Sequence, residues 1–280
     1  LSAGFVLGDE SLIENLFRIR AGEVVFLGEN GMINRYYHYH FLPSSFSGDP
    51  PALLKKELIG IFQKITGRLI DSLNGRTAVI PLSGGYDSRL IAALLKFAGY
   101  KKVICFTYGV PGRESELSER VASRLGYKWL FVDYRNFDKV SYLEEKSFRD
   151  YVEYAGNAVS MPYLQEYFAV KEFKEKNLIP NDSIFLPGHT GDYIAGSYSE
   201  KTIKKIKGEK DRTNRISNGY FWFVKLGSAQ RRQISDRLRQ WFYHYEHPPC
   251  HTDPVYDVLT EDWDLKEKFS KFVFNSARVF

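Results

Sequence analysis

Six consecutive residues, Ser83-Gly84-Gly85-Tyr86-Asp87-Ser88, combine the chemical groups that bind a polyphosphate. Glycine has no Cβ, so the two glycines let a ligand approach the backbone closely. Their N–H groups and those of a following helix can converge on an anion at the helix N-terminus. Ser83 and Ser88 add hydroxyl donors, and Asp87 supplies a hard oxygen ligand of the kind that Mg²⁺ prefers. The stretch predicts a polyphosphate site with Mg²⁺; the competing interpretation is a glycine turn before an ordinary capped helix.

A second stretch, Phe106-Thr107-Tyr108-Gly109, ends another apolar run. A strand that ends beside a phosphate loop can hydrogen-bond the edge of an adenine through its backbone. The residues barely favour this interpretation over a plain strand-to-loop transition. Glu114 and Glu116 open the next predicted helix, where acidic side chains are favourable in any case.

A third stretch follows the apolar run 183–186 and reads Pro187-Gly188-His189-Thr190-Gly191-Asp192. In a parallel sheet, this loop and the first one leave the same edge, so Asp192 and Asp87 can face each other across one crevice. Two carboxylates and a polyphosphate together make a magnesium site. The alternative is a polar turn between two structural elements, which the presence of the first loop disfavours.

Alternating strands and helices position these loops. Apolar runs predict strands over 77–82, 103–108 and 129–132, and the segments between them predict helices over 87–98 and about 115–125. Short connections between buried strands indicate a parallel α/β sheet with right-handed crossovers. Helical spacing from Leu54 to Leu73 predicts a long helix that ends at Asn74-Gly75.

The first 42 residues have a different pattern. A short helix is predicted over residues 12–17, capped by Asp9 or Ser11. A β-hairpin follows, with strands over 23–27 and 32–40 and an Asn30-Gly31 turn. Two strands and a helix cannot bury a core alone, so we expect this segment to be the edge of a larger unit. Residues 43–51 read as a linker.

The first loop resembles the PP-loop of the ATP-pyrophosphatase superfamily, whose members cleave ATP between its α- and β-phosphates. The third stretch narrows the resemblance. Gly188-x-x-x-Asp192 followed by Gly196-x-Tyr198 is similar to the second signature of asparagine synthetases. Residues 1–42 resemble the closing helix and hairpin of the glutaminase domain that precedes the synthetase domain in that family. The resemblance implies a closing glutaminase segment at 1–46 and an adenine nucleotide α-hydrolase-like PP-loop domain at 47–280, with a helical C-terminal part.

That family activates a substrate carboxylate with ATP as an acyl-adenylate, releases pyrophosphate, and transfers glutamine-derived ammonia to form an amide. The resemblance implies ATP and Mg²⁺ as cofactors, a small-molecule carboxylate as substrate, and a glutaminase domain or subunit as partner. It places the pyrophosphate and its metal at Ser83, Gly84, Gly85, Asp87 and Ser88. It places the adenosine against Leu82 and Tyr108, the ribose or adenylate beside Pro187 and Gly188, and the second metal carboxylate at Asp192.

His189 is the main departure from the family pattern. The family has a glutamate here that handles protons during ammonia attack, and relatives that form β-lactams have a tyrosine. An imidazole with an ordinary pKa near 6.5 can act as a general base near neutral pH; the alternative is a loop histidine without that role. The acceptor is therefore aspartate or another carboxylate, such as a sugar acid.

The composition of the chain limits which partners and which cysteine-based sites are expected. The formal charge of +5 suits an anionic nucleotide without requiring nucleic acid, and we expect neither a nucleic-acid nor a membrane partner. Two cysteines exclude a disulfide framework and a four-cysteine zinc site. With no signal peptide and no membrane-length apolar run, we expect a cytoplasmic protein.

Beyond residue 200 the sequence gives structural indications only. The basic stretch 201–215 is interpreted as a solvated loop rather than a nucleic-acid contact. Helices are predicted over 228–246 and 261–280. The residues His244, His247, Cys250 and His251 suggest a zinc cluster only weakly, because Pro248 and Pro249 make the spacing irregular.

The leading hypothesis is an AMP-forming amide ligase of asparagine synthetase type. A PP-loop enzyme that modifies tRNA and a non-catalytic nucleotide-binding module are the alternatives. The chain lacks the glutaminase cysteine at its start and stops before the family's later Arg-Pro-Leu segment and catalytic lysine. We therefore expect the isolated chain to be inactive.

Overall fold

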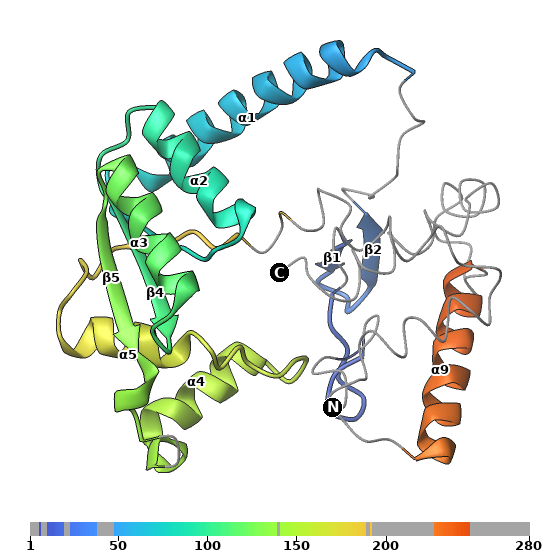
Figure 1. The fold of residues 1–280 in the computed structure, drawn as a ribbon. Helices are drawn as coiled ribbons and strands as arrows, with labels where there is room; N and C mark the ends of the chain where they lie inside the picture. Colours follow the sequence, from blue (N-terminus) through green and yellow to red (C-terminus); the bar gives the residue numbers. More distant parts are fainter. Residues whose placement is uncertain are drawn as a thin grey trace. The chain divides into compact units, whose positions relative to one another are not determined.

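The computed structural model describes residues 6, 10–19, 23–37, 48–138, 141–188, 191 and 227–246 (Figure 1). The chain divides into two compact units. The first comprises Ser45–Phe148 and Tyr163–Gly191, and the remaining described residues belong to the second. The predicted domain division between residues 46 and 47 stays a prediction.

A four-stranded parallel sheet forms the centre of the first unit. Its strands are β3 (Ala78–Pro81), β4 (Val103–Gly109), β5 (Lys128–Asp133) and β6 (Ile184–Phe185), in the order β5-β4-β3-β6. Every neighbouring pair is parallel. The apolar runs become buried strands because helices cover both faces of such a sheet. The predicted α/β fold with a parallel sheet is confirmed.

Helices α1 (Pro51–Leu73), α2 (Tyr86–Phe97) and α3 (Arg113–Leu125) pack on one face, and α5 (Tyr167–Glu175) packs on the other. Alternate strand residues serve the two faces, as the period of a β-strand requires. Ile80 and Cys105 face α2 and α3, whereas Val79 and Phe106 face α5. The Phe106 ring meets Phe173 of α5 edge-on, with 5.0 Å between the ring centroids.

The sequence analysis assigned no element between residues 133 and 182, where two helices lie. These are α4 (Lys146–Gly156) and α5, with short 3-10 turns at Tyr134–Asn136 and Ser141–Glu144. The signal for α5 is the i, i+4 spacing of Ala169 and Phe173, both of which are buried. Helix α5 covers the second face of the sheet together with Tyr134, Phe137, Leu178 and Ile179.

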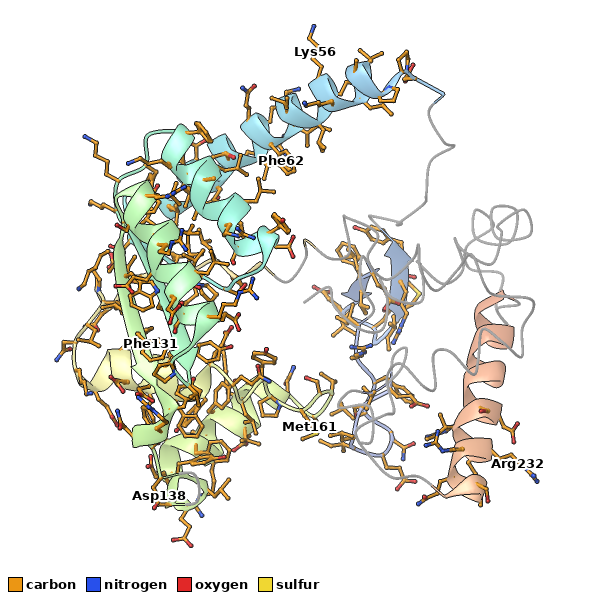
Figure 2. All side chains as sticks on the ribbon, viewed as in Figure 1. Lys56, Phe62, Phe131, Asp138, Met161 and Arg232 are labelled. Carbon is orange, nitrogen blue, oxygen red and sulfur yellow. The ribbon has the colours of Figure 1, made fainter. Side chains whose placement is uncertain are left out.

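Helix α1 is buried only at its C-terminal end. Leu73 is 1% exposed and packs in the α2–α3 core. Leu54, Leu58 and Ile65 remain 39–52% exposed, although they share the predicted helical spacing. Figure 2 shows Lys56 pointing outward from this N-terminal half. The helix ends where the Asn-Gly signal predicts, with Asn74 in the left-handed conformation at φ 46°.

The second unit contains the predicted hairpin. Strands β1 (Glu23–Leu27) and β2 (Ile33–Tyr37) pair antiparallel, and Glu23 lies opposite Tyr37. The loop is closed by Gly31, whose φ is 75°, and by the Asn30 side chain, whose Oδ1 accepts a hydrogen bond from the Met32 N–H at 3.1 Å. Helix α9 (Ser228–Glu246) has the predicted bounds.

The predicted short helix over residues 12–17 is wrong. The segment forms a turn. The Ser11 hydroxyl accepts a hydrogen bond from the Ile13 N–H at 3.0 Å and donates to the Ile13 carbonyl oxygen, which replaces a helical start by a local turn. Asn15 is left-handed, with a φ of 61°, and this ends any helical path.

Other predictions lie outside the described residues. They are the loop 201–215, the helix 261–280, residues 38–40 of the hairpin and the side chains of the weak zinc cluster. Within the described part of the chain, no helix is both long and apolar enough to cross a membrane.

Candidate active site

The three predicted loops leave the same edge of the sheet. Strand β3 lies between β4 and β6, and all three run parallel, with Pro81 opposite Phe106 and Val79 opposite Phe185. The carboxyl ends of parallel strands are where such sheets bind ligands. The structure therefore brings the glycine loop, the Tyr108-Gly109 exit and the start of the 187–192 loop to one edge.

Gly188 and Gly191 lie directly against the first turn of α2. A Cβ built on Gly188 would lie 3.0 Å from the Ser88 nitrogen and 3.1 Å from the Asp87 Cβ. A Cβ on Gly191 would lie 2.4 Å from the Asp87 Cγ. The Gly191 N–H donates a hydrogen bond to the Gly188 carbonyl oxygen at 3.1 Å. Only glycine permits this approach to the Asp87 carboxylate.

The glycine loop, residues 83–88, is held by its own hydroxyl groups. The Ser83 N–H donates to the Ser88 Oγ at 3.1 Å, and the two hydroxyl oxygens lie 3.2 Å apart. The Gly85 N–H donates to the Ser83 Oγ at 3.1 Å. Ser88 is 4% exposed, so its hydroxyl is a fixed part of the loop. These donors and acceptors keep the backbone in a tight turn before α2.

Helix α2 begins at Gly85 without a side-chain cap. Gly85 has an extended backbone, with φ −73° and ψ 168°. The only acidic residue in the first turn is Asp87, which is half-buried. Among the described residues, no hydrogen bond or ion pair is formed by the Asp87 carboxylate. An uncapped N-terminus with a carboxylate beside it suits an anion and a divalent cation together.

Arg89 contacts the loop from its helical side, which the sequence analysis missed. Its Nε donates to the Gly85 carbonyl oxygen at 2.7 Å, and its Nη2 donates to the Gly84 carbonyl oxygen at 3.0 Å. The guanidinium carbon lies 4.5 Å from the centroid of the Tyr86 ring. No sequence motif predicts these contacts. The only indication in the sequence is that Arg89 follows Gly85 by four residues, which places both on one side of the helix.

Glu114 contacts the loop from the neighbouring helix. The Gly84 N–H donates to its Oε1 at 3.4 Å. A Cβ on Gly84 would lie 3.7 Å from the Glu114 Cγ and 3.6 Å from the Leu117 Cδ2, which is ordinary contact. The sequence placed Glu114 only as a favourable acid of a helix start. The structure adds that its carboxylate faces a backbone donor of the glycine loop.

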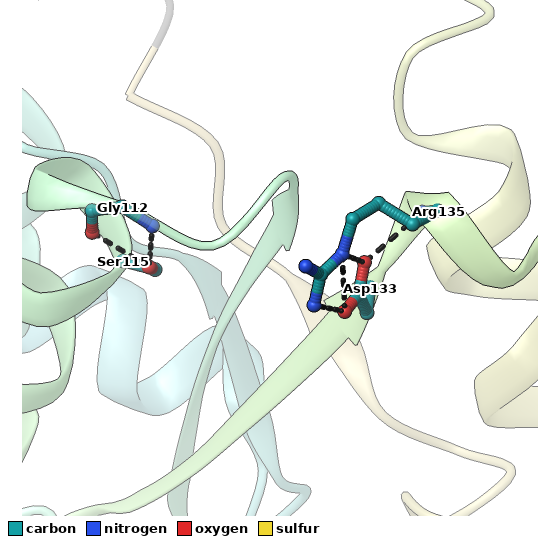
Figure 3. Close-up of polar contacts among 4 residues, drawn as sticks. All are labelled: Gly112, Ser115, Asp133 and Arg135. Atoms are coloured by element: carbon teal, nitrogen blue, oxygen red, sulfur yellow. Dashed lines mark hydrogen bonds and ion pairs between the residues drawn. The ribbon is translucent and has the colours of Figure 1, made fainter.

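Helix α3 begins differently, as Figure 3 shows. The Ser115 Oγ accepts a hydrogen bond from the Gly112 N–H at 3.0 Å and donates to the Gly112 carbonyl oxygen at 2.8 Å. The same figure shows Asp133 at the end of β5 paired with Arg135, whose Nη2 lies 2.5 Å from Oδ2. The hydrogen bonds from Arg135 lower the pKa of Asp133. Both polar pairs are complete without a ligand.

Leu82 and Thr107 fix the base of the glycine loop. The Leu82 side chain is 1% exposed and packs in the α2–α3 core, so it is the backbone of Leu82 that begins the loop. The Thr107 Oγ1 donates to the Leu82 carbonyl oxygen at 2.8 Å and accepts a hydrogen bond from the Trp129 Nε1 at 3.1 Å. These contacts join the backbone after β3 to Thr107 in β4 and to Trp129 near the start of β5. A role for Leu82 against adenosine stays a prediction.

Tyr108 turns its ring toward the α5 face. It stacks on Tyr134, with 5.2 Å between centroids and 17° between planes. Burial, with a smaller contribution from Glu166 and Tyr163, raises the pKa of the Tyr108 phenol, so it stays protonated near neutral pH. The strand exit beside it, Gly109, has a φ of 119° that favours glycine. The predicted contact of Tyr108 with adenosine stays a prediction.

Of the remaining predicted site residues, the structure describes Pro187 and Gly188. Pro187 and Gly188 follow β6 directly, with Pro187 exposed and Gly188 against α2. His189, Thr190 and Asp192 lie outside the described residues, so their predicted roles stay predictions. The described part of the chain contains no group of three His, Cys, Asp or Glu side chains that could hold a metal. The predicted magnesium pair requires only Asp87 and Asp192.

The chain was compared with known proteins by structure and by sequence. One solved structure with similarity is the NH3-dependent NAD synthetase from Campylobacter jejuni, at 13% sequence identity and a TM-score of 0.35. The alignment covers 70% of this chain and 97% of that chain. No curated protein has a significant sequence match. The asparagine synthase family model matches residues 75–271, which include the glycine loop and the 187–192 loop. The chain belongs to the asparagine synthase family.

Proposed function

We propose that this protein is an ATP-dependent, amide-forming ligase of asparagine synthase type. It activates a substrate carboxylate as an acyl-adenylate, releases pyrophosphate, and transfers the acyl group to glutamine-derived ammonia. The observation that carries this proposal is the contact of Gly188 and Gly191 with Asp87 and Ser88, at one sheet edge. Family membership supports the reaction class.

The glycine loop fits a pyrophosphate group. Gly85 would meet only the Ser83 Oγ within 4 Å of an added Cβ, at 3.1 Å, so its exposed side is open to a ligand. In the proposed complex, the hydroxyls of Ser83 and Ser88 bind the pyrophosphate. The N–H groups of Gly84 and Gly85 exchange their hydrogen bonds to Glu114 and Ser83 for hydrogen bonds to it. Donors fixed before the reaction stabilise charge that develops on a departing group, an effect worth several kcal/mol in enzymes.

The Asp87 carboxylate fits a magnesium ion, because it is half-buried and lies where the two loops meet. Asp192, one residue beyond Gly191, is proposed as the second ligand. When bound, the metal neutralises negative charge on the phosphates. Leu82, Tyr108, Pro187 and Gly188 are proposed to border the adenosine and the ribose or adenylate.

His189 is proposed as the general base for attack by ammonia. In sequence it lies between Gly188 and Gly191, the two glycines that contact Asp87, and an imidazole can act as a general base near neutral pH. The acceptor is a small carboxylate, either aspartate or a sugar acid. Ammonia comes from a glutaminase domain or subunit, and residues 1–46 are proposed to be the closing segment of such a domain.

The test uses the full-length protein with ATP, Mg²⁺ and an ammonium salt. Pyrophosphate release is measured across a panel of carboxylates that includes aspartate and uronic acids. We expect release of pyrophosphate and AMP, not ADP, only when one carboxylate is present. Release with tRNA and with no carboxylate overturns the proposal in favour of a tRNA-modifying enzyme. Tight ATP binding without release under any condition indicates a non-catalytic nucleotide-binding module.

A further inference from the structure

The guanidinium of Arg89 bridges two consecutive peptide groups of the glycine loop. Nε binds the Gly85 carbonyl oxygen at 2.7 Å and Nη2 binds the Gly84 carbonyl oxygen at 3.0 Å. The Tyr86 ring lies under the guanidinium, 4.5 Å from its carbon to the ring centroid. The Arg89 side chain is also half-buried. Burial and these contacts together restrict its motion.

The planar trans peptide transmits this restraint to the opposite side of the loop. The C=O and N–H of one peptide unit point in opposite directions. Holding the Gly84 carbonyl therefore orients the Gly85 N–H, and holding the Gly85 carbonyl orients the Tyr86 N–H. The Gly85 N–H is on the Ser83 side, where it donates to the Ser83 Oγ at 3.1 Å.

Two adjacent glycines make such a restraint necessary. Glycine populates positive and negative φ almost equally, so the Gly84–Gly85 peptide can rotate at low cost. A rotated peptide would direct a carbonyl oxygen, instead of an N–H group, at a bound anion. A guanidinium with a fixed fork of donors can hold both oxygens at once.

We propose that Arg89 is a positioning residue that keeps the glycine loop in its anion-binding conformation. This inference rests on the proposed function of the loop. The fork of donors, rather than the positive charge alone, performs the role. Lysine keeps the charge but has one compact ammonium group, so it cannot reproduce the two-point contact.

The experiment compares Arg89→Lys and Arg89→Gln with the matched control Arg124→Gln, an exposed arginine in the last turn of α3. Binding of magnesium pyrophosphate and of ATP to the full-length protein is measured by calorimetry. We expect both Arg89 variants to weaken binding of both ligands by about tenfold or more, the scale of two charge-assisted hydrogen bonds. Arg124→Gln should bind both ligands as the wild type does.

Two further readouts separate positioning from general stability. The KM for ATP should rise in both Arg89 variants, while the KM for the acceptor carboxylate stays within about twofold. Amide hydrogen exchange should accelerate at Gly85 and Tyr86 and stay unchanged in β4. If Arg89→Lys binds pyrophosphate as tightly as the wild type, or if all kinetic constants fall together with the melting temperature, the inference is wrong. A wild-type protein that binds neither pyrophosphate nor ATP overturns the proposed function, and this inference with it.

Discussion

Helices α2 and α3 begin at the same edge of one sheet, and each has glycine at its N-cap. Their first turns are stabilised in different ways. In α3, Ser115 closes the turn on Gly112, and Glu114 and Glu116 complement the positive end of the helix dipole. In α2 there is no side-chain cap, and Arg89 adds a positive charge beside the loop.

This difference favours the start of α2 as the proposed anion site. The α3 start is complete in itself, because its own side chains supply the cap and the negative charge. The α2 start keeps backbone donors beside small glycines and has a carboxylate under the second loop. The N-terminus of α3 therefore has a structural role, whereas the N-terminus of α2 is proposed to bind ATP.

The largest effect is expected from removing the first-turn acid of α2. Asp87→Asn should lower pyrophosphate release by about 100-fold or more, because a neutral amide is a poorer ligand than a carboxylate for the proposed magnesium ion. The matched change in α3 is Glu116→Gln, which should leave release within about twofold. Steady-state pyrophosphate release measures both variants. Equal turnover of Asp87→Asn and the wild type would remove Asp87 from the mechanism.

The second effect concerns the contact between Gly191 and Asp87 in the first turn of α2. Gly191→Ala places a Cβ where the Asp87 Cγ lies 2.4 Å away, so the two loops must separate. We expect about 1–3 kcal/mol lower stability and about tenfold slower pyrophosphate release, from overpacking and misplacement of Asp87. Urea unfolding and steady-state kinetics measure the two effects. The control is Gly60→Ala in α1, where no atom lies within 4 Å, and it should be at least as stable as the wild type. Normal stability and turnover of Gly191→Ala would show that the loops do not meet in this way.

The third prediction concerns the N-terminus of α3, which is stabilised by its own residue Ser115. Ser115→Ala removes both hydrogen bonds to Gly112 and should cost about 1 kcal/mol of stability, as the loss of a helix cap does. Pyrophosphate release measured well below the melting temperature should be unchanged. A loss of release without a loss of stability would place the α3 start in the active site and remove the contrast with α2.

The smallest effect depends on pH. Because Arg135 lowers the pKa of Asp133 in the folded protein, the pair stabilises the protein above the ordinary aspartate pKa of about 3.9. That contribution is lost as the pH falls through the lowered pKa. Arg135→Gln should therefore melt at a lower temperature than the wild type at pH 7, and the two melting curves should converge in acid. A difference that grows toward pH 3 would have the opposite sign and contradict the assignment.

The sequence predicted elements well where one local pattern decides them. The run before Ser83 and the glycines after it define β3 and the start of α2, and Asn74-Gly75 defines the end of α1. Residues 12–17 show the limit of such patterns. Their apolar spacing is helical, but the Ser11 hydroxyl stabilises a local turn instead.

The site was predictable only in part, for a physical reason. The sequence indicated that Asp87 and the 187–192 loop leave one sheet edge, because strand direction determines that. It did not indicate that Arg89 would bridge two carbonyl groups or that Glu114 would face the Gly84 N–H. Those contacts depend on side-chain rotamers and on the packing of α3 beside the loop, and neither leaves a motif. Helix α5 was missed because its small and aromatic core residues lack a continuous aliphatic pattern.

The most direct test of the central claim compares the two N-cap glycines. Gly85→Ala and Gly112→Ala both put a Cβ at the start of a helix, with only the Ser83 hydroxyl near the first and no atom within 4 Å of the second. Each should lower stability by about 1 kcal/mol or less. Calorimetric titration of the full-length protein with ATP and Mg²⁺ should show about tenfold weaker binding for Gly85→Ala, because the methyl group holds the phosphates away from the backbone, and unchanged binding for Gly112→Ala. Equal binding by the two variants would contradict the assignment of the phosphate site to the start of α2.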